Sequence, residues 1–75
     1  MIPASELTKE ERNAISTLER LAKRWPESLW LFSGSGRLWV MRKNAQGEQA
    51  YTPRGGNDQA YCVKHIEIEN DGGDW

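Results

Sequence analysis

The chain has 75 residues, one cysteine, one histidine and a net charge of −1. This length supports one domain, and so short a chain buries only about 60% of the surface that its unfolded form exposes. A lone thiol excludes an internal disulfide, and a lone histidine excludes the usual zinc sites. Extra stability therefore has to come from large aromatic side chains, from a homodimer, or from a partner surface.

Charge is unevenly distributed along the sequence. All ten Lys and Arg residues precede residue 67, where they are accompanied by seven acids. The other four acids lie at the C-terminal end: Glu67, Glu69, Asp71 and Asp74. We therefore expect a single domain over 1–75 with a weakly basic body and an acidic tail over 67–75. That balance is poor for tight duplex binding, which needs many phosphate contacts.

The N-terminal residues do not predict a signal peptide, because no basic stretch is followed by a long apolar run. No window approaches the roughly 18 apolar residues of a membrane span. A single thiol is also typical of a reducing compartment. Together these features predict a soluble protein of the cytoplasm, with no membrane partner.

A helix is predicted to begin at Thr8 and to end near Arg24. Thr8 and Glu11 fit a capping box, in which each side chain binds a free backbone amide of the first turn. Pro26 cannot continue the helix. Apolar residues recur with the helical period of 3.6 between these signals: Ala14, Ile15, Leu18, Leu21, Ala22 and Trp25.

Residues 28–43 predict a β-hairpin around a two-residue turn, Gly34-Ser35. Glycine at the first central position suits a type II′ turn, and this register places Trp30 opposite Trp39. One face of the hairpin is then aliphatic and the other aromatic. The aliphatic face holds Leu29, Leu31, Leu38 and Val40, and the aromatic face holds Trp30, Phe32, Trp39 and Met41 together with Arg37.

Two more strands are predicted, a short one over Glu48–Thr52 and a last one over Ala60–Glu69. The expected fold class is α+β, with one N-terminal helix packed on a three- to four-stranded antiparallel sheet. We place the helix on the aliphatic face, because its own apolar residues are mostly aliphatic. The opposite assignment stays open, because large aromatics remove the most apolar area from water when they are buried.

No catalytic or metal-binding constellation is predicted, so we expect neither an enzyme nor a cofactor. Cys62 and His65 are three residues apart on a strand, and strict alternation puts them on opposite faces. Glu67, Glu69 and Asp71 resemble the first half of a calcium loop, but the chain ends before the acid required at position twelve.

The predicted partner-binding site combines the aromatic face with the acidic tail. Trp, Phe, Met and Arg are enriched at protein interfaces or at their hot spots, and an acidic tail can meet a basic patch. The site comprises Trp30, Phe32, Arg37, Trp39, Met41, Glu67, Glu69, Asp71 and Asp74. One alternative is a single-stranded nucleic-acid-binding module, in which the aromatics stack on bases. Another is that Trp30 and Trp39 only pack across the strands.

The pattern LWLF…LWVMRK…GE, then GG-x-D-x-x-Y and the ending NDGGDW, resembles small accessory proteins of phages and prophages over residues 29–75. Anti-CRISPR proteins are one such group, short, cytosolic and mostly non-enzymatic. The resemblance implies a phage-derived inhibitor in the host cytoplasm. It would occupy a surface of a CRISPR effector complex and block nucleic-acid binding or nuclease recruitment. A net charge of −1 is smaller than that of proteins that imitate DNA over their whole surface. Imitation of DNA is therefore expected only locally, at the acidic tail.

Overall fold

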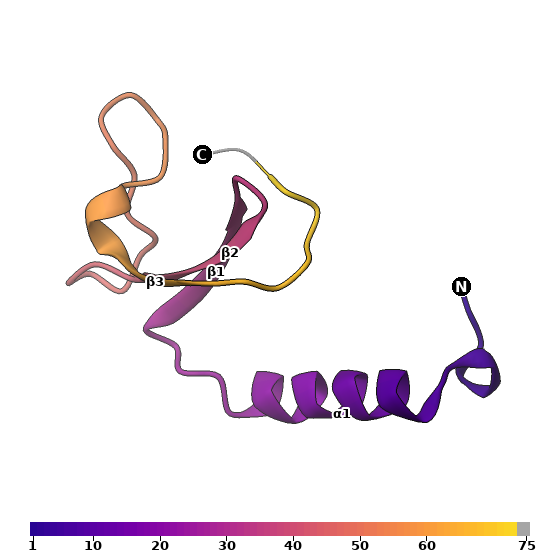
Figure 1. The fold of residues 1–75 in the computed structure, drawn as a ribbon. Coiled ribbons are helices and arrows are strands. Elements are labelled where there is room, and N and C mark those ends of the chain that lie inside the picture. The colour runs from indigo at the N-terminus through magenta and orange to yellow at the C-terminus, as the bar shows by residue number, and fades with distance from the viewer. Residues whose placement is uncertain (74–75) are drawn as a thin grey trace.

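The computed structural model describes residues 1–73, and the predicted α+β fold is confirmed. One N-terminal helix is followed by a three-stranded antiparallel sheet with strand order β1-β2-β3 (Figure 1). The elements in chain order are the 3-10 turn η1 (Ala4–Glu6), α1 (Lys9–Lys23), β1 (Leu29–Gly34), β2 (Arg37–Arg42), the 3-10 turn η2 (Gln59–Tyr61) and β3 (Cys62–Ile66). The predicted site residue Asp74 lies outside the described residues, as does Trp75.

The N-terminus of α1 forms as its sequence predicts. The Glu11 amide donates a hydrogen bond of 3.0 Å to the Thr8 hydroxyl, and the Thr8 amide donates one of 2.8 Å to the Glu11 carboxylate. Amides at this end of a helix lack partners within the helix, so the two side chains satisfy them. The helix ends at Lys23, shortly before Pro26.

The turn between β1 and β2 lies one residue later than predicted. Ser35 and Gly36 both have left-handed backbone conformations, with φ of 55° and 76°. Two successive residues of this kind form a type I′ turn, whose twist matches that of the flanking strands. The predicted type II′ turn at Gly34-Ser35 is therefore wrong. Glycine is used at the second central position of the turn, where Gly36 stands.

This turn shifts the register of the hairpin by two residues. Trp30 lies opposite Met41 and Phe32 opposite Trp39, so the predicted pairing of the two tryptophans is wrong. Because side chains alternate with period two, a shift of two leaves every side chain on its predicted face. The hairpin thus keeps an aliphatic face and an aromatic face with the predicted members.

The strand predicted over Glu48–Thr52 does not form. The Asn44 side chain accepts hydrogen bonds from the amides of Gln46 and Glu48 and closes a turn at this place. The segment that follows makes one isolated bridge, between Tyr51 and Asn57. β3 therefore pairs directly with β2, and the sheet of the described chain has three strands.

A β-bulge changes the alternation in β3. Trp39 lies opposite His65 and Met41 opposite Cys62, because the register shifts between Val40 and Met41. Cys62 and His65 therefore both come beside residues of the aromatic face, which corrects the prediction that they lie on opposite faces. No hydrogen bond joins these two side chains within residues 1–73, and Cys62 is a free thiol.

The buried core is small and lies on the aromatic face. Met41 is 0% exposed, and Ala50 in the β2–β3 loop is the other buried apolar residue among those described. No residue of α1 is buried, and Ile15 and Leu18 are 47% and 64% exposed. Figure 1 shows α1 extending beyond the sheet. The radius of gyration is accordingly 15.1 Å, against about 11 Å for a compact chain of this length.

We predict that Ser35→Asn raises the free energy of unfolding by about 0.5–1 kcal/mol, because asparagine tolerates the left-handed conformation better than serine. Urea denaturation followed by tryptophan fluorescence measures the change. Gly36→Ala is the comparison, since alanine at a φ of 76° should lower stability by about 1 kcal/mol. Equal effects of the two substitutions would contradict a type I′ turn.

Candidate protein-binding surface

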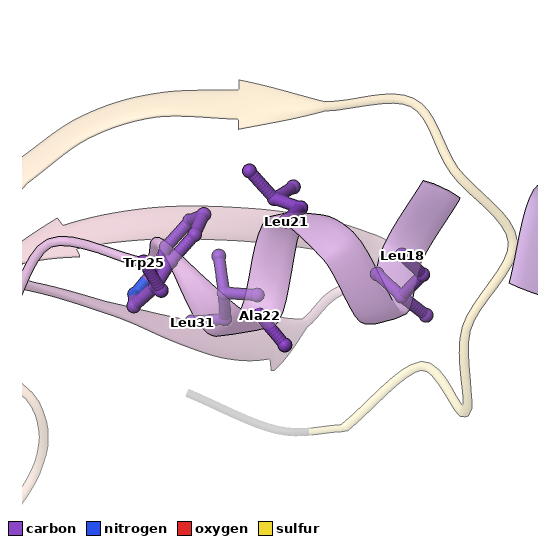
Figure 2. Close-up of a pocket in the computed structure, with 5 residues that line it drawn as sticks. All are labelled: Leu18, Leu21, Ala22, Trp25 and Leu31. Atoms are coloured by element: carbon purple, nitrogen blue, oxygen red, sulfur yellow. The ribbon is translucent and has the colours of Figure 1, made fainter. Parts of the chain in front are cut away.

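Two adjoining cavities of about 340 and 520 Å³ form an open, mainly apolar groove beside α1. The first lies between α1 and β1, and Figure 2 shows the residues that line it: Leu18, Leu21, Ala22, Trp25 and Leu31. The second shares Leu18 and Leu21 with the first, extends toward the N-terminus of α1, and reaches Ile68 after β3. It is completed by Asn13, Ala14, Ile15 and Thr17. We call the surface lined by both sets the apolar groove.

The apolar groove lies on the aliphatic side of the sheet. Leu31 belongs to the aliphatic face, so the C-terminal part of α1 lies on the side of the sheet to which the sequence assigns the helix. The helix does not close over it, because Leu31 remains 43% exposed and Ile66 and Ile68 are exposed as well. A continuous apolar surface left open to water is typical of an interaction site.

Trp25 fixes the C-terminal end of α1 against the sheet. Its indole Nε1 donates a hydrogen bond of 2.9 Å to the carbonyl of Leu29. The neighbouring Ser28 carbonyl accepts from the Lys43 amide across the hairpin at 2.8 Å, so the Leu29 carbonyl points to the outer edge of β1. The indole therefore satisfies an edge acceptor and also closes one end of the apolar groove.

The aromatic face, predicted as the binding surface, packs largely within the chain. Met41 is completely buried and cannot contact a partner as predicted. Trp39 donates from Nε1 to a β1 carbonyl at 2.7 Å, and its ring lies 5.0 Å from that of His65. The rings of Trp30 and Phe32 meet edge to face with centroids 6.2 Å apart. The rings of Trp30, Phe32 and Trp39 are half-buried and stabilise the fold.

The chain after β3 lies against the hairpin turn, and we call residues 67–73 the tail strap. The amides of Ser35 and Gly36 donate to carbonyls of the tail strap at 3.1 and 3.3 Å. A Cβ on Gly73 would come within 2.0 Å of the Ser33 carbonyl oxygen. The close approach of the tail strap to β1 therefore requires glycine at this position.

The tail strap brings two predicted site residues, Glu67 and Asp71, to the turn end of the sheet. Glu67 lies 3.0 Å from the Arg37 guanidinium and 3.3 Å from the His65 ring. Asp71 accepts a hydrogen bond from the Ser33 hydroxyl. The Arg37–Glu67 pair is exposed, and such pairs contribute little to stability. The pair brings the Glu67 carboxylate beside both Arg37 and His65.

Asp71 is held in its charged form by the contacts of the tail strap. The Ser33 hydroxyl lowers the pKa of Asp71, and the Gly73 amide, which also donates to this carboxylate, lowers it further. A depressed pKa stabilises the folded chain above the ordinary pKa of aspartate. That contribution is lost as the pH falls through the depressed value. Glu69, by contrast, is exposed and forms no ion pair with another described residue.

Within residues 1–73, no group of three His, Cys, Asp or Glu side chains is placed to hold a metal ion. No helix in that part of the chain has the length and apolar character needed to cross a bilayer. Comparisons with known protein families, with curated proteins and with solved structures found no match. Function is therefore inferred from the apolar groove and the tail strap themselves.

Sequence reasoning found the residues of the apolar groove but predicted that the fold would bury them. The period of 3.6 shows which side of α1 is apolar, and it does not show how far that side lies from the sheet. One signal of exposure is present in the sequence. The apolar stripe of α1 and Trp25 spans residues 14–25, whereas the hairpin offers only four aliphatic side chains to cover it.

We predict that Ser33→Ala raises the pKa of Asp71 toward its ordinary value, because the variant lacks the hydroxyl that favours the carboxylate. An NMR titration of the Asp71 side-chain carboxyl carbon measures the shift. Ser28→Ala is the control, since the one hydrogen bond of Ser28 within residues 1–73 is accepted by its backbone carbonyl. An unchanged titration in Ser33→Ala would show that the hydroxyl does not hold the tail strap.

We also predict that Gly73→Ala releases the tail strap and lowers the free energy of unfolding by about 1–2 kcal/mol, because the added Cβ collides with Ser33 and breaks hydrogen bonds. The matched control is Gly56→Ala, whose Cβ would meet only Thr52 Oγ1 at 3.8 Å. Its stability should stay within about 0.5 kcal/mol of wild type. Hydrogen exchange in the β1–β2 turn reports the release, and slow exchange in Gly73→Ala would argue against it.

Proposed function

We propose that this chain is a non-enzymatic protein-binding module that uses the apolar groove as its interaction surface. The observation that carries the proposal is the exposure of apolar side chains on both walls of the groove, Leu18 on α1 and Leu31 on β1. Burial of apolar area is the main favourable contribution to most protein association. A groove of this kind suits the apolar face of an amphipathic helix.

The total surface area supports the proposal. The chain exposes 6287 Å², whereas a compact monomer of 8.6 kDa exposes about 4,700 Å². The excess of roughly 1,600 Å² is larger than the about 800 Å² that each partner contributes to a standard protein interface. An extended α1 beside an open groove therefore leaves enough surface for a stable complex.

We further propose that the target is a host defence complex. The resemblance of residues 29–75 to phage accessory proteins supports a phage-derived inhibitor of CRISPR effector subunits, acting in the host cytoplasm. Such an inhibitor would block nucleic-acid binding or nuclease recruitment by covering a surface. The tail strap would add a local acidic region from Glu67, Glu69 and Asp71, which can speed association with a basic partner.

Single-stranded nucleic acid is the competing class of ligand, and no observation favours it. Base stacking needs open aromatic rings. On the aromatic face, however, Met41 is buried and the Trp39 ring already contacts that of His65. Arg37, the cation of this face, is engaged by Glu67. Protein binding through the apolar groove requires none of these groups to move.

Addition of the chain to a purified CRISPR effector complex tests the proposal. We predict weaker binding of target DNA or weaker nuclease recruitment, measured by mobility shift and by pull-down of the nuclease. Leu31→Lys should reduce this effect roughly tenfold or more, because it places a charge on a wall of the apolar groove. Val63→Lys is the control, since Val63 is 61% exposed and lines neither cavity.

Circular dichroism establishes that both variants fold. Inhibition by folded Leu31→Lys that equals the wild-type effect would show that the apolar groove is not the interface. A wild-type chain without effect on any class of effector complex would reject the host-defence target.

A further inference from the structure

The charges at the two ends of α1 do not face the apolar groove. Residues 9–12, at the N-terminal end, carry two bases and two acids. Arg20 and Lys23, in the last turn, lie on the side of α1 away from the apolar stripe, where Arg20 donates a hydrogen bond to the Ser16 hydroxyl. Arg42 lies on the aliphatic face, because it pairs with the first residue of β1. The charges of α1 that can contact an occupant of the apolar groove are therefore those on the rim of the apolar stripe.

A second set of charges flanks the apolar stripe of α1. Arg12 and Glu19 are seven residues apart, so they lie on the same side of the helix, next to Ile15. Neither forms an ion pair with another residue of the described chain. One positive and one negative side chain thus stand unpaired on the rim of an uncovered apolar surface.

We propose that the apolar groove is occupied by α1 of a second copy of this chain, with the two helices antiparallel across a twofold axis. The inference rests on the proposed function, in which the apolar groove binds protein, and it names the occupant. In an antiparallel pair the helix dipoles attract, and Arg12 of each copy can approach Glu19 of the other. A parallel pair would align the helix dipoles and would leave Arg12 about two turns away from Glu19 of the second copy.

One register satisfies the apolar stripe and the rim charges together. When Ile15 packs beside Leu18 of the second copy, the twofold symmetry repeats the contact with the roles exchanged. The same register sets Arg12 opposite Glu19 of the second copy, again twice in each dimer. Rim pairs of this kind contribute more to specificity and alignment than to affinity.

The dimer also accounts for the large exposed surface. A standard interface takes about 800 Å² from each partner, which is half of the roughly 1,600 Å² by which the chain exceeds a compact monomer. The interface is isologous, so one patch serves both copies and the assembly closes at two. Gly72, Gly73 and the hairpin turn do not line the apolar groove. This end of the molecule therefore stays available to a target in the dimer.

Sedimentation velocity of the full chain tests the inference. We predict a concentration-dependent dimer for wild type. R12E and E19R each convert both rim pairs to like-charge pairs, and each should weaken dimerisation roughly tenfold. A mixture of R12E with E19R should form a heterodimer of wild-type affinity, because both rim pairs then join opposite charges again. An interface elsewhere on the molecule would give no such rescue.

Leu18→Lys supplies a second measurement that does not depend on the rim. Leu18 is exposed in the single chain, so the variant should retain its circular dichroism spectrum. Its dimerisation should weaken roughly a hundredfold, because a charge replaces an apolar contact at the centre of the interface. Ser16→Lys is the matched control, since it adds the same charge on the side of α1 away from the apolar stripe.

A wild-type chain that remains monomeric up to about 1 mM would overturn the dimer. Failure of the mixed rescue would overturn the antiparallel register. The proposed function fails separately from this inference. A dimer that responds to these variants but changes no effector activity would reject the host target alone. A monomer whose inhibition depends on Leu31 would reject the dimer alone and assign the apolar groove to a different protein.

Discussion

Complete burial of Met41 is the packing interaction on which the other features of the structure depend. β2 is the central strand, so Met41 lies between Trp30 of β1 and Cys62 of β3. Removing this side chain from water contributes about 2 kcal/mol to stability. The half-buried rings of Trp30, Phe32 and Trp39 share the aromatic face with it. The β2–β3 loop supplies Ala50, the other buried apolar residue among those described. The aliphatic face is left to α1, which reaches it closely only at its C-terminal end.

Because α1 leaves most of β1 uncovered, other segments have to cover the unpaired backbone groups at its outer edge. β1 is an edge strand, and unpaired edge groups invite pairing with other chains. Trp25 binds the Leu29 carbonyl at one end of β1, and the approach of Gly73 covers Ser33 at the other. The open part of the edge is thereby reduced to the region of Leu31. The tail strap is thus an edge cover that also carries three exposed acids, Glu67, Glu69 and Asp71.

Features set by local chemistry could be predicted from the sequence. The capping box at Thr8 begins α1, and period-two alternation sorts the hairpin faces even when the register is misjudged by two. The sequence allows a turn at Gly34-Ser35 or at Ser35-Gly36. The turn forms at Ser35-Gly36, as a type I′ turn whose twist matches that of the flanking strands. The separation of α1 from the sheet could not be predicted, because the period of 3.6 shows which side of the helix is apolar and not how far that side lies from the sheet. For the candidate site, composition favoured the aromatic rings as an interface. They pack within the chain instead, because burying large rings removes the most apolar area from water.

A chain with two buried apolar residues among those described lies near the lower limit of independent stability. If a second α1 fills the apolar groove, folding and association are coupled, and the free energy of unfolding rises with protein concentration. A target that competed for the apolar groove would have to displace the second copy and lose that stabilisation. A target that bound the tail strap would meet the dimer intact. In the dimer, loss of inhibition in Leu31→Lys would therefore reflect loss of assembly through the apolar groove, while the tail strap presents its acids to the target.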